Sequence, residues 1–136
     1  MPYESADIVL LLIRVAIGVV FFAHGANKIK DMKSTSGFVG SLGFKPAAWW
    51  AWFLAGSEFF GGMAMVAGFL AKLAAIPMII TMVVALYFKT FKWHAPFLTA
   101  EHGGTDIVYI LLAGLGAVLL AGAGQISVDG FLRITG

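Results

Sequence analysis

The stretch IVLLLIRVAIGVVFFAHGA, residues 8–26, decides what kind of protein this chain is. Its only ionisable side chains are Arg14 and His24. A helix needs about 20 consecutive, mainly apolar residues to cross the hydrocarbon core of a membrane. In that core the backbone N–H and C=O groups can bond only to one another, so a crossing segment is helical. The stretch therefore predicts a membrane-spanning helix that carries two ionisable groups.

Three more apolar runs follow along the chain. The run 47–70 contains Glu58 as its sole charge, the run 73–89 contains Pro77, and the last run opens with Asp106. Each is close to the length that a membrane crossing requires. We predict one all-α domain over residues 1–136, an integral membrane four-helix bundle with helices at about 8–27, 47–70, 73–89 and 106–124.

Composition supports this prediction and excludes other classes. Apolar residues make up 60% of the 136, and charged residues make up 12%, about half the usual fraction for a soluble domain. The net charge of +2 comes from scattered lysines rather than a basic stripe, which argues against a nucleic-acid partner. The chain has no cysteine, so thiolate metal sites and disulfide exchange are excluded. The acidic start and Arg14 indicate a retained first helix rather than a cleaved signal peptide.

Two long polar loops are expected at one end of the bundle. The first, residues 27–46, contains a segment at 34–44 that suggests a short interfacial helix or a re-entrant turn, and the second is residues 89–105. All four tryptophans and six of the seven lysines are expected near this end. By the positive-inside rule we expect a multi-pass protein of the cytoplasmic membrane, with long loops in the cytoplasm and both termini outside.

Ionisable side chains inside the predicted spans need an explanation. A charge at mid-bilayer costs roughly 2.5–3.5 kcal/mol or more, so such groups face the interior and find partners. An Arg14–Glu58 ion pair is geometrically feasible. We predict a polar funnel with Arg14 and Glu58 at its floor. Its mouth would be formed by Lys28, His24, His102 and Asp106.

Each of these groups also has a purely structural interpretation. Arg14 and Glu58 can be an ion pair that only sets helix register, and Asp106 can be a helix cap. His24 can be a donor between helices. The three histidines lack the spacing of metal ligands, so no metal site is expected.

Small residues indicate how the helices pack. Ala113, Ala117 and Ala121 recur at every fourth position, and glycines are frequent in the second and fourth runs. Because lipid gives no hydrophobic reward for helix association, such positions favour close backbone approach. We predict that these residues pack within the bundle, although they would also allow a homodimer.

Several motifs together resemble the DoxX family of small bacterial and archaeal membrane proteins. The segment from Arg14 to Lys28 reads R-x3-G-x2-F-x2-HG-x2-K, and F-x3-LG follows at Phe38. The second run contains GSE-x2-GG-x5-G from Gly56, and Gly-rich segments flank the fourth run at 103–104 and 122–129. The resemblance covers nearly the whole chain. The polar positions of the family correspond here to Arg14, His24, Lys28 and Glu58.

The resemblance implies a four-helix membrane bundle and, more loosely, redox chemistry. Members or relatives of the family are known as subunits of thiosulfate:quinone oxidoreductase and as membrane partners in redox-stress assemblies. The first hypothesis is therefore the membrane subunit of an oxidoreductase that binds a quinone, with no covalent cofactor and with a soluble redox partner protein. Glu58 and His24 would be catalytic. The ligand-binding residues would be Arg14, Lys28, His102 and Asp106.

Two other functions stay open on the sequence alone. A non-enzymatic membrane scaffold, or a module that binds lipid, would use the same polar residues for architecture. A small transporter is the third hypothesis, although Pro77 and the 34–44 segment are its only candidates for a broken helix.

Overall fold

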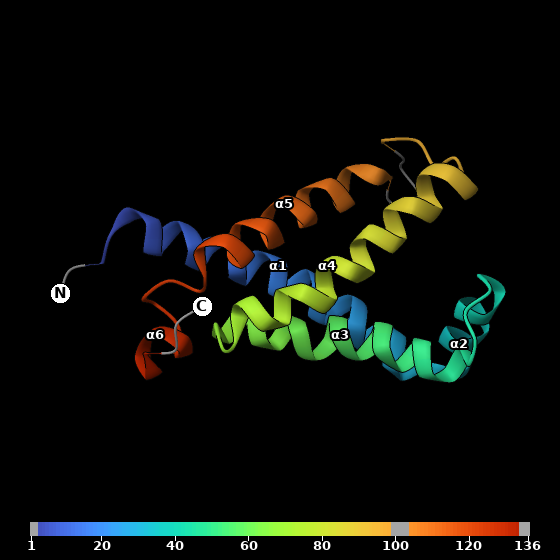
Figure 1. Cartoon of the computed structure of the whole chain (residues 1–136), viewed down its shortest axis with the longest axis horizontal. Helices are drawn as coiled ribbons and strands as arrows, with labels where there is room; N and C mark the ends of the chain where they lie inside the picture. The colour runs from blue at the N-terminus through green and yellow to red at the C-terminus, as the bar shows by residue number, and fades with distance from the viewer. Residues whose placement is uncertain (1–2, 99–103, 134–136) are drawn as a thin grey trace.

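The computed structural model describes residues 3–98 and 104–133, and this part of the chain is all-α, as predicted (Figure 1). A π-helical stretch, η1, continues the fourth helix. The elements are α1 (Ser5–Lys30), α2 (Met32–Ser41), α3 (Ala47–Ala67), α4 (Ala71–Tyr87), η1 (Phe88–Lys92), α5 (Thr105–Ala121) and α6 (Val128–Leu132).

Four of these helices, α1, α3, α4 and α5, overlap the four predicted runs. Most of α2 lies within the 34–44 segment, for which a short helix was one of the two expectations. The last helix, α6, was not predicted. In the described part of the chain, two helices are long and apolar enough to cross a membrane: α1, with mean hydropathy 2.5, and Ala71–Lys92, with mean hydropathy 2.0. α5 is a shorter apolar helix, and α3 is 21 residues long with three tryptophans and Glu58.

The helices associate as two pairs, α1 with α3 and α4 with α5. Figure 1 shows the pairs crossing near the end that holds the chain termini and separating toward the end that holds α2. The buried core lies where the pairs meet. Its members include Phe21, Met65, Met78 and Leu115. The separated ends leave room for the cavity described below.

Glycines form the contact between α1 and α3. A Cβ atom added to Gly25 would lie 2.3 Å from the backbone nitrogen of Phe59, and one added to Gly62 would lie 2.5 Å from that of Phe22. The two backbones therefore touch, which is the arrangement that small residues permit in membrane helices. The rings of Phe22 and Phe59 stack beside this contact, with centroids 4.8 Å apart.

The alanine positions of α5 do not pack as predicted. Ala113 and Ala121 are exposed, and a Cβ atom added to Gly116 would meet nothing within 4 Å. Leu115 and Val118 face the core instead. The prediction of packing within the bundle is therefore wrong for Ala113 and Ala121, because α5 turns these two alanines outward, whereas Gly114 packs closely against Ile17 of α1. A homodimer through this face stays a prediction.

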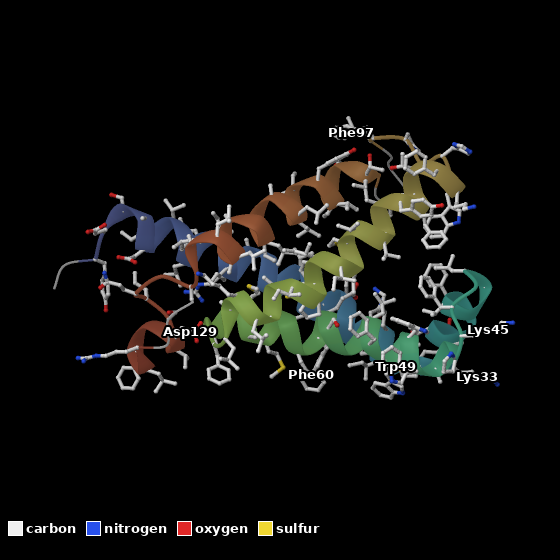
Figure 2. All side chains as sticks on the ribbon, in the orientation of Figure 1. Lys33, Lys45, Trp49, Phe60, Phe97 and Asp129 are labelled. Atoms are coloured by element: carbon white, nitrogen blue, oxygen red, sulfur yellow. The ribbon has the colours of Figure 1, made fainter. Side chains whose placement is uncertain are left out.

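The outer surface of the helices is mainly apolar along its length. Figure 2 shows side chains projecting from every helix, among them Trp49 and Phe60, which are 58% and 63% exposed. Lys33 and Lys45 lie at the α2 end, and Asp129 lies at the other end (Figure 2). So much exposed apolar surface on a protein of this size marks a surface that contacts lipid or another protein.

Candidate functional site

Arg14 lies at the end of the bundle that holds the termini, and its side chain is fully buried. Its Nη1 donates to the carbonyl oxygens of Met65 at 2.9 Å and Val66 at 3.3 Å, in the last turn of α3. Its Nε donates to the carbonyl oxygen of Ala123 at 2.9 Å, and its Nη2 donates to that of Ile126. Carbonyl groups in the last turn of a helix have no partner within the helix, and Arg14 supplies one.

This arrangement corrects the predicted floor of the funnel. Arg14 does not pair with Glu58, and it does not line the cavity. The sequence indicated that Arg14 needed a partner, but its acceptors are backbone oxygens, which have no residue signature. The contacts of Arg14 therefore fit a purely structural role, which was one of the two interpretations of the sequence. Its partners are carbonyl groups rather than the carboxylate of Glu58.

Asp129 completes the same end of the protein. Its two carboxylate oxygens accept hydrogen bonds from the backbone N–H groups of Leu70, at 2.7 Å, and Ala71, at 3.0 Å. These two N–H groups lie at the start of α4, where the N-cap residue, Leu70, has no side chain that could cap the helix. A carboxylate there also meets the positive end of the helix dipole. The segment 122–133 thus folds back over the start of α4, and Asp7 holds it by accepting from the N–H of Gln125 at 2.9 Å.

Lys28 and Glu58 form an ion pair nearer the other end. Lys28 Nζ lies 2.8 Å from Glu58 Oε2, and the Glu58 side chain is 5% exposed, against 27% for Lys28. Lys28 comes from the last turn of α1, and Glu58 comes from the middle of α3. Burial of a carboxylate needs a partner, and Lys28 provides it. The lysine keeps donor capacity for a second acceptor, because one ammonium group carries three N–H bonds.

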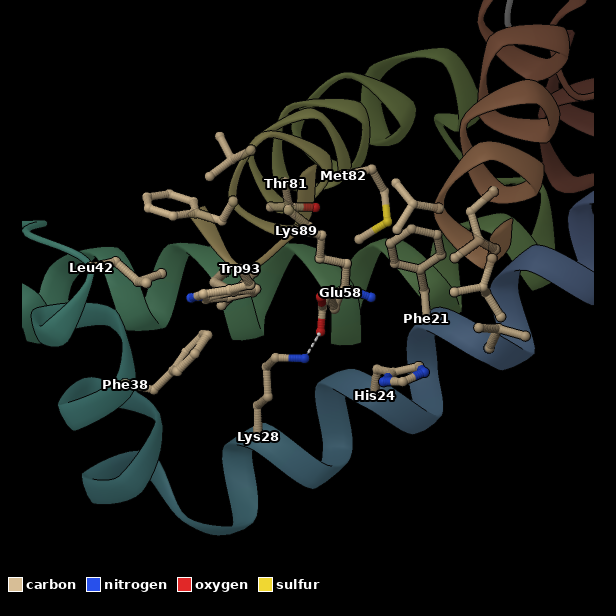
Figure 3. Close-up of a pocket in the computed structure, with 18 residues that line it drawn as sticks. Phe21, His24, Lys28, Phe38, Leu42, Glu58, Thr81, Met82, Lys89 and Trp93 are labelled. Carbon is tan, nitrogen blue, oxygen red and sulfur yellow. Dashed lines mark hydrogen bonds and ion pairs between the residues drawn. The ribbon is translucent and has the colours of Figure 1, made fainter. Parts of the chain in front are cut away.

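The ion pair borders a cavity of about 250 Å³ between the two helix pairs. Figure 3 shows the dashed contact between Lys28 and Glu58, with His24 on the next turn of α1. Lys89 of η1 also lines the cavity, and its Nζ donates to the carbonyl oxygen of Gly104 at 3.5 Å. The rest of the lining is apolar or aromatic except for Thr81. Among the residues concerned are Phe21, Leu54, Met82, Val108 and Leu111.

Aromatic rings form the cavity wall toward the α2 end. Phe38 of α2 and Trp93, just after η1, have ring centroids 6.0 Å apart, and Phe88 lies 5.8 Å from Trp93. Phe44 then links Phe88, at 6.2 Å, to Trp50 at the start of α3, at 5.7 Å. This aromatic chain connects the two helix pairs where they separate, so it bounds the cavity on that side.

The structure brings together some of the predicted site residues. His24, Lys28 and Glu58 line the cavity, whereas Asp106 does not. Asp106 lies in the first turn of α5, where its charge meets the positive end of the helix dipole. His102 lies outside the described residues. The catalytic and ligand-binding roles assigned to these residues from the sequence stay predictions.

Lys89 and Thr81 were not singled out from the sequence as site residues. Lys89 looked like an interfacial lysine at the end of a span, and Thr81 was one hydroxyl in an apolar run. Only the packing of α4, which η1 continues, against α3 places them on the cavity. Within residues 3–98 and 104–133, no three His, Asp or Glu side chains gather as a metal site would require.

The described part of the chain is all-α and contains two helices long and apolar enough to cross a membrane, and comparison with known sequences identifies its family. The sequence model of the DoxX family matches residues 9–93, so the chain belongs to the DoxX family of membrane proteins. It is similar to the protein named "Putative oxidoreductase CatD" of Bacillus subtilis (strain 168). The two are 30% identical over 129 residues, which cover 95% of this chain and 90% of the relative. No solved structure matches the chain.

Proposed function

We propose that four helical segments, α1, α3, α4 with η1, and α5, cross the cytoplasmic membrane as one bundle. The 26 residues of α1 extend for about 39 Å at 1.5 Å per residue, enough to cross the hydrocarbon core with some tilt. Exposed apolar side chains along the helices support this placement. Trp49, Trp52 and Trp93 are exposed near the α2 end, where tryptophans of an interfacial belt would lie. The long loops would face the cytoplasm.

Within this bundle the cavity binds the head of a quinone, and the protein serves as the membrane subunit of an oxidoreductase. One observation carries this proposal: an ion pair between the half-buried Lys28 and the buried Glu58 borders a mainly apolar cavity that His24 also lines. Ligand sites combine an apolar wall with a few polar groups in this way. The volume of about 250 Å³ suits a single substituted ring. The name of the Bacillus subtilis relative points to the same reaction class.

The polar groups have separate roles in this proposal. A quinone has two carbonyl oxygens, and the Lys28 ammonium group can donate to one while it stays paired with Glu58. Reduction of a quinone to a quinol takes two electrons and two protons. Glu58 and His24 can pass those protons, since carboxylate and imidazole groups transfer protons near neutral pH. The electrons would come from a soluble redox partner protein.

Quinone binding to the purified protein in mild detergent tests this function. Lys28→Met and Glu58→Gln should each weaken binding of a short-chain quinone at least tenfold. Lys30→Met is the matched control, because Lys30 is exposed on the same helix and does not line the cavity. Binding at wild-type strength in both cavity variants would reject the site.

A lipid-binding scaffold is the second candidate, and the two lysines on the cavity favour it. Lys28 and Lys89 carry two positive charges against the single negative charge of Glu58. This balance suits an anionic lipid head. Mass spectrometry of lipids that co-purify with the protein distinguishes the two functions. An anionic phospholipid that is lost with Lys89→Met, together with no quinone binding, would favour the scaffold.

A further inference from the structure

A second, smaller groove of about 90 Å³ adjoins the cavity between α2, α3 and α4. The two share the lining residues Leu54 of α3, Thr81 and Val84 of α4, and Leu42, which follows α2. The groove lies on the side of the bundle where Ile80 is exposed. The cavity and the groove are therefore direct neighbours.

Among the described residues, the lining of the groove offers no free polar group for a ligand head. Thr81 Oγ1 already donates to the carbonyl oxygen of Met78 at 2.8 Å, and Trp50 Nε1 donates to that of Lys45 at 3.3 Å. The other side chains are apolar. They are Val39, Leu42, Phe44, Phe53, Leu54, Ile80 and Val84. The groove therefore suits hydrocarbon, whereas the cavity beside it holds the charged groups.

The lining of the cavity changes from its loop end to the groove. Toward the loops, the rings of Phe38, Trp93 and Phe88 line the cavity. On the groove side, Ile80 is 48% exposed and belongs to the apolar outer surface of α4. In the proposed bundle this surface contacts acyl chains. A ligand that partitions into the membrane reaches the cavity through the groove more directly than a water-soluble one does.

We infer that the groove binds the alkyl or isoprenoid chain of the ligand whose head occupies the cavity. The substrate class is then a chain-bearing amphiphile that enters laterally between α3 and α4, not a water-soluble molecule. The identity of the head as a quinone rests on the proposed function, but the chain site rests on the groove itself. Because the groove is small, it holds the part of the chain next to the head, and the remainder lies in the membrane.

Two isoleucines on α4 make a matched pair for testing this inference. Ile80 lines the groove, and Ile76, one turn earlier, lines neither the groove nor the cavity. Their exposures are nearly equal, at 48% and 47%. A tryptophan at position 80 fills the groove, whereas one at position 76 only enlarges the outer surface. Any general effect of a tryptophan on α4 is therefore common to both variants.

The experiment measures the Kd of a decyl-substituted quinone and of the same quinone without a chain, for the wild type, Ile80→Trp and Ile76→Trp. Ile80→Trp should raise the Kd of the decyl quinone about tenfold, because the added ring occupies the volume of the chain. The chainless quinone should change less than about twofold, and Ile76→Trp should leave both unchanged. Ile80→Phe, with a smaller ring, should give the same pattern with a smaller factor. Equal effects of the variants at positions 76 and 80 would overturn the chain site.

A second probe separates failure of this inference from failure of the proposed function. If neither quinone binds, a spin-labelled fatty acid replaces it, since its chain is the same chemistry with another head. Weaker binding of the fatty acid to Ile80→Trp than to Ile76→Trp would support the chain site while the quinone function fails. No binding of either probe, or binding insensitive to both variants, would overturn the chain site.

Discussion

Arg14 and Glu58 are both charged side chains buried in apolar helices, and their surroundings differ. Arg14 donates to four backbone carbonyl groups from two distant segments, and it lines neither the cavity nor the groove. Among the described residues Glu58 has one partner, Lys28, and both lie on a cavity. A buried charge that bonds to several backbone groups away from any cavity holds the fold together. An ion pair on a cavity still has bonding capacity for a ligand, so the functional hypothesis belongs to the second region.

The largest expected effect comes from removing the buried guanidinium group. Arg14→Leu removes the side-chain donor of four carbonyl groups, of which Met65 keeps a bond from the N–H of Gly68, and we expect it to lower the free energy of unfolding by about 4 kcal/mol. Thermal unfolding in detergent, followed by circular dichroism, measures this loss. Arg14→Lys keeps the charge but not the planar guanidinium group, so its free energy of unfolding should lie between those of the wild type and Arg14→Leu. A stable Arg14→Leu variant would contradict the structural assignment of this region.

The glycine contact between α1 and α3 fixes how these two helices pack against each other. A substitution there should have the next largest effect on stability. Gly25→Ala places a methyl group against the backbone of Phe59, so we expect a loss of about 2 kcal/mol. Gly116→Ala is the matched control, because its methyl group meets open space. It should be as stable as the wild type, or more stable by about 0.5 kcal/mol. Equal melting temperatures for the two variants would show that the helices do not touch there.

Removal of the carboxylate that caps α4 should have a moderate effect. Asp129→Ala leaves the N–H groups of Leu70 and Ala71 without their acceptor, and we expect a loss of about 1.5 kcal/mol. Hydrogen exchange should show faster exchange at these two amides than at the middle of α4. Unchanged protection would mean that Asp129 does not cap the helix.

The smallest effects on stability are expected at the ion pair on the cavity. Glu58→Gln should cost less than about 1 kcal/mol, because the long Lys28 side chain can turn toward a more polar environment. Lys28→Met should cost more, since Glu58 is nearly buried and would lose its partner. The order of the two melting temperatures checks this asymmetry. If Glu58→Gln lowered the free energy of unfolding as much as Arg14→Leu does, Glu58 would be as structural as Arg14.

Several parts of the site were predictable because they follow from local sequence. The spacing of His24 and Lys28 places them one turn apart near the end of α1, and both line the cavity. Glu58 was identified as the lone charge of its span. The cavity itself was not predictable, because its volume arises from the angle between two helix pairs, which no residue pattern specifies. Lys89 and Thr81 became site residues only through that angle.

The sequence by itself determined that the protein is helical and apolar, and that its buried charges require partners. These conclusions follow from composition and from the cost of leaving charge or backbone unpaired in hydrocarbon. Only the tertiary structure decided which partners they take. Arg14 binds carbonyl groups of α3 and of the segment after α5, and Asp129 caps a helix 58 residues away. Every residue carries a carbonyl and nearly every residue an N–H group, so the choice among them depends on which helix ends the fold brings together.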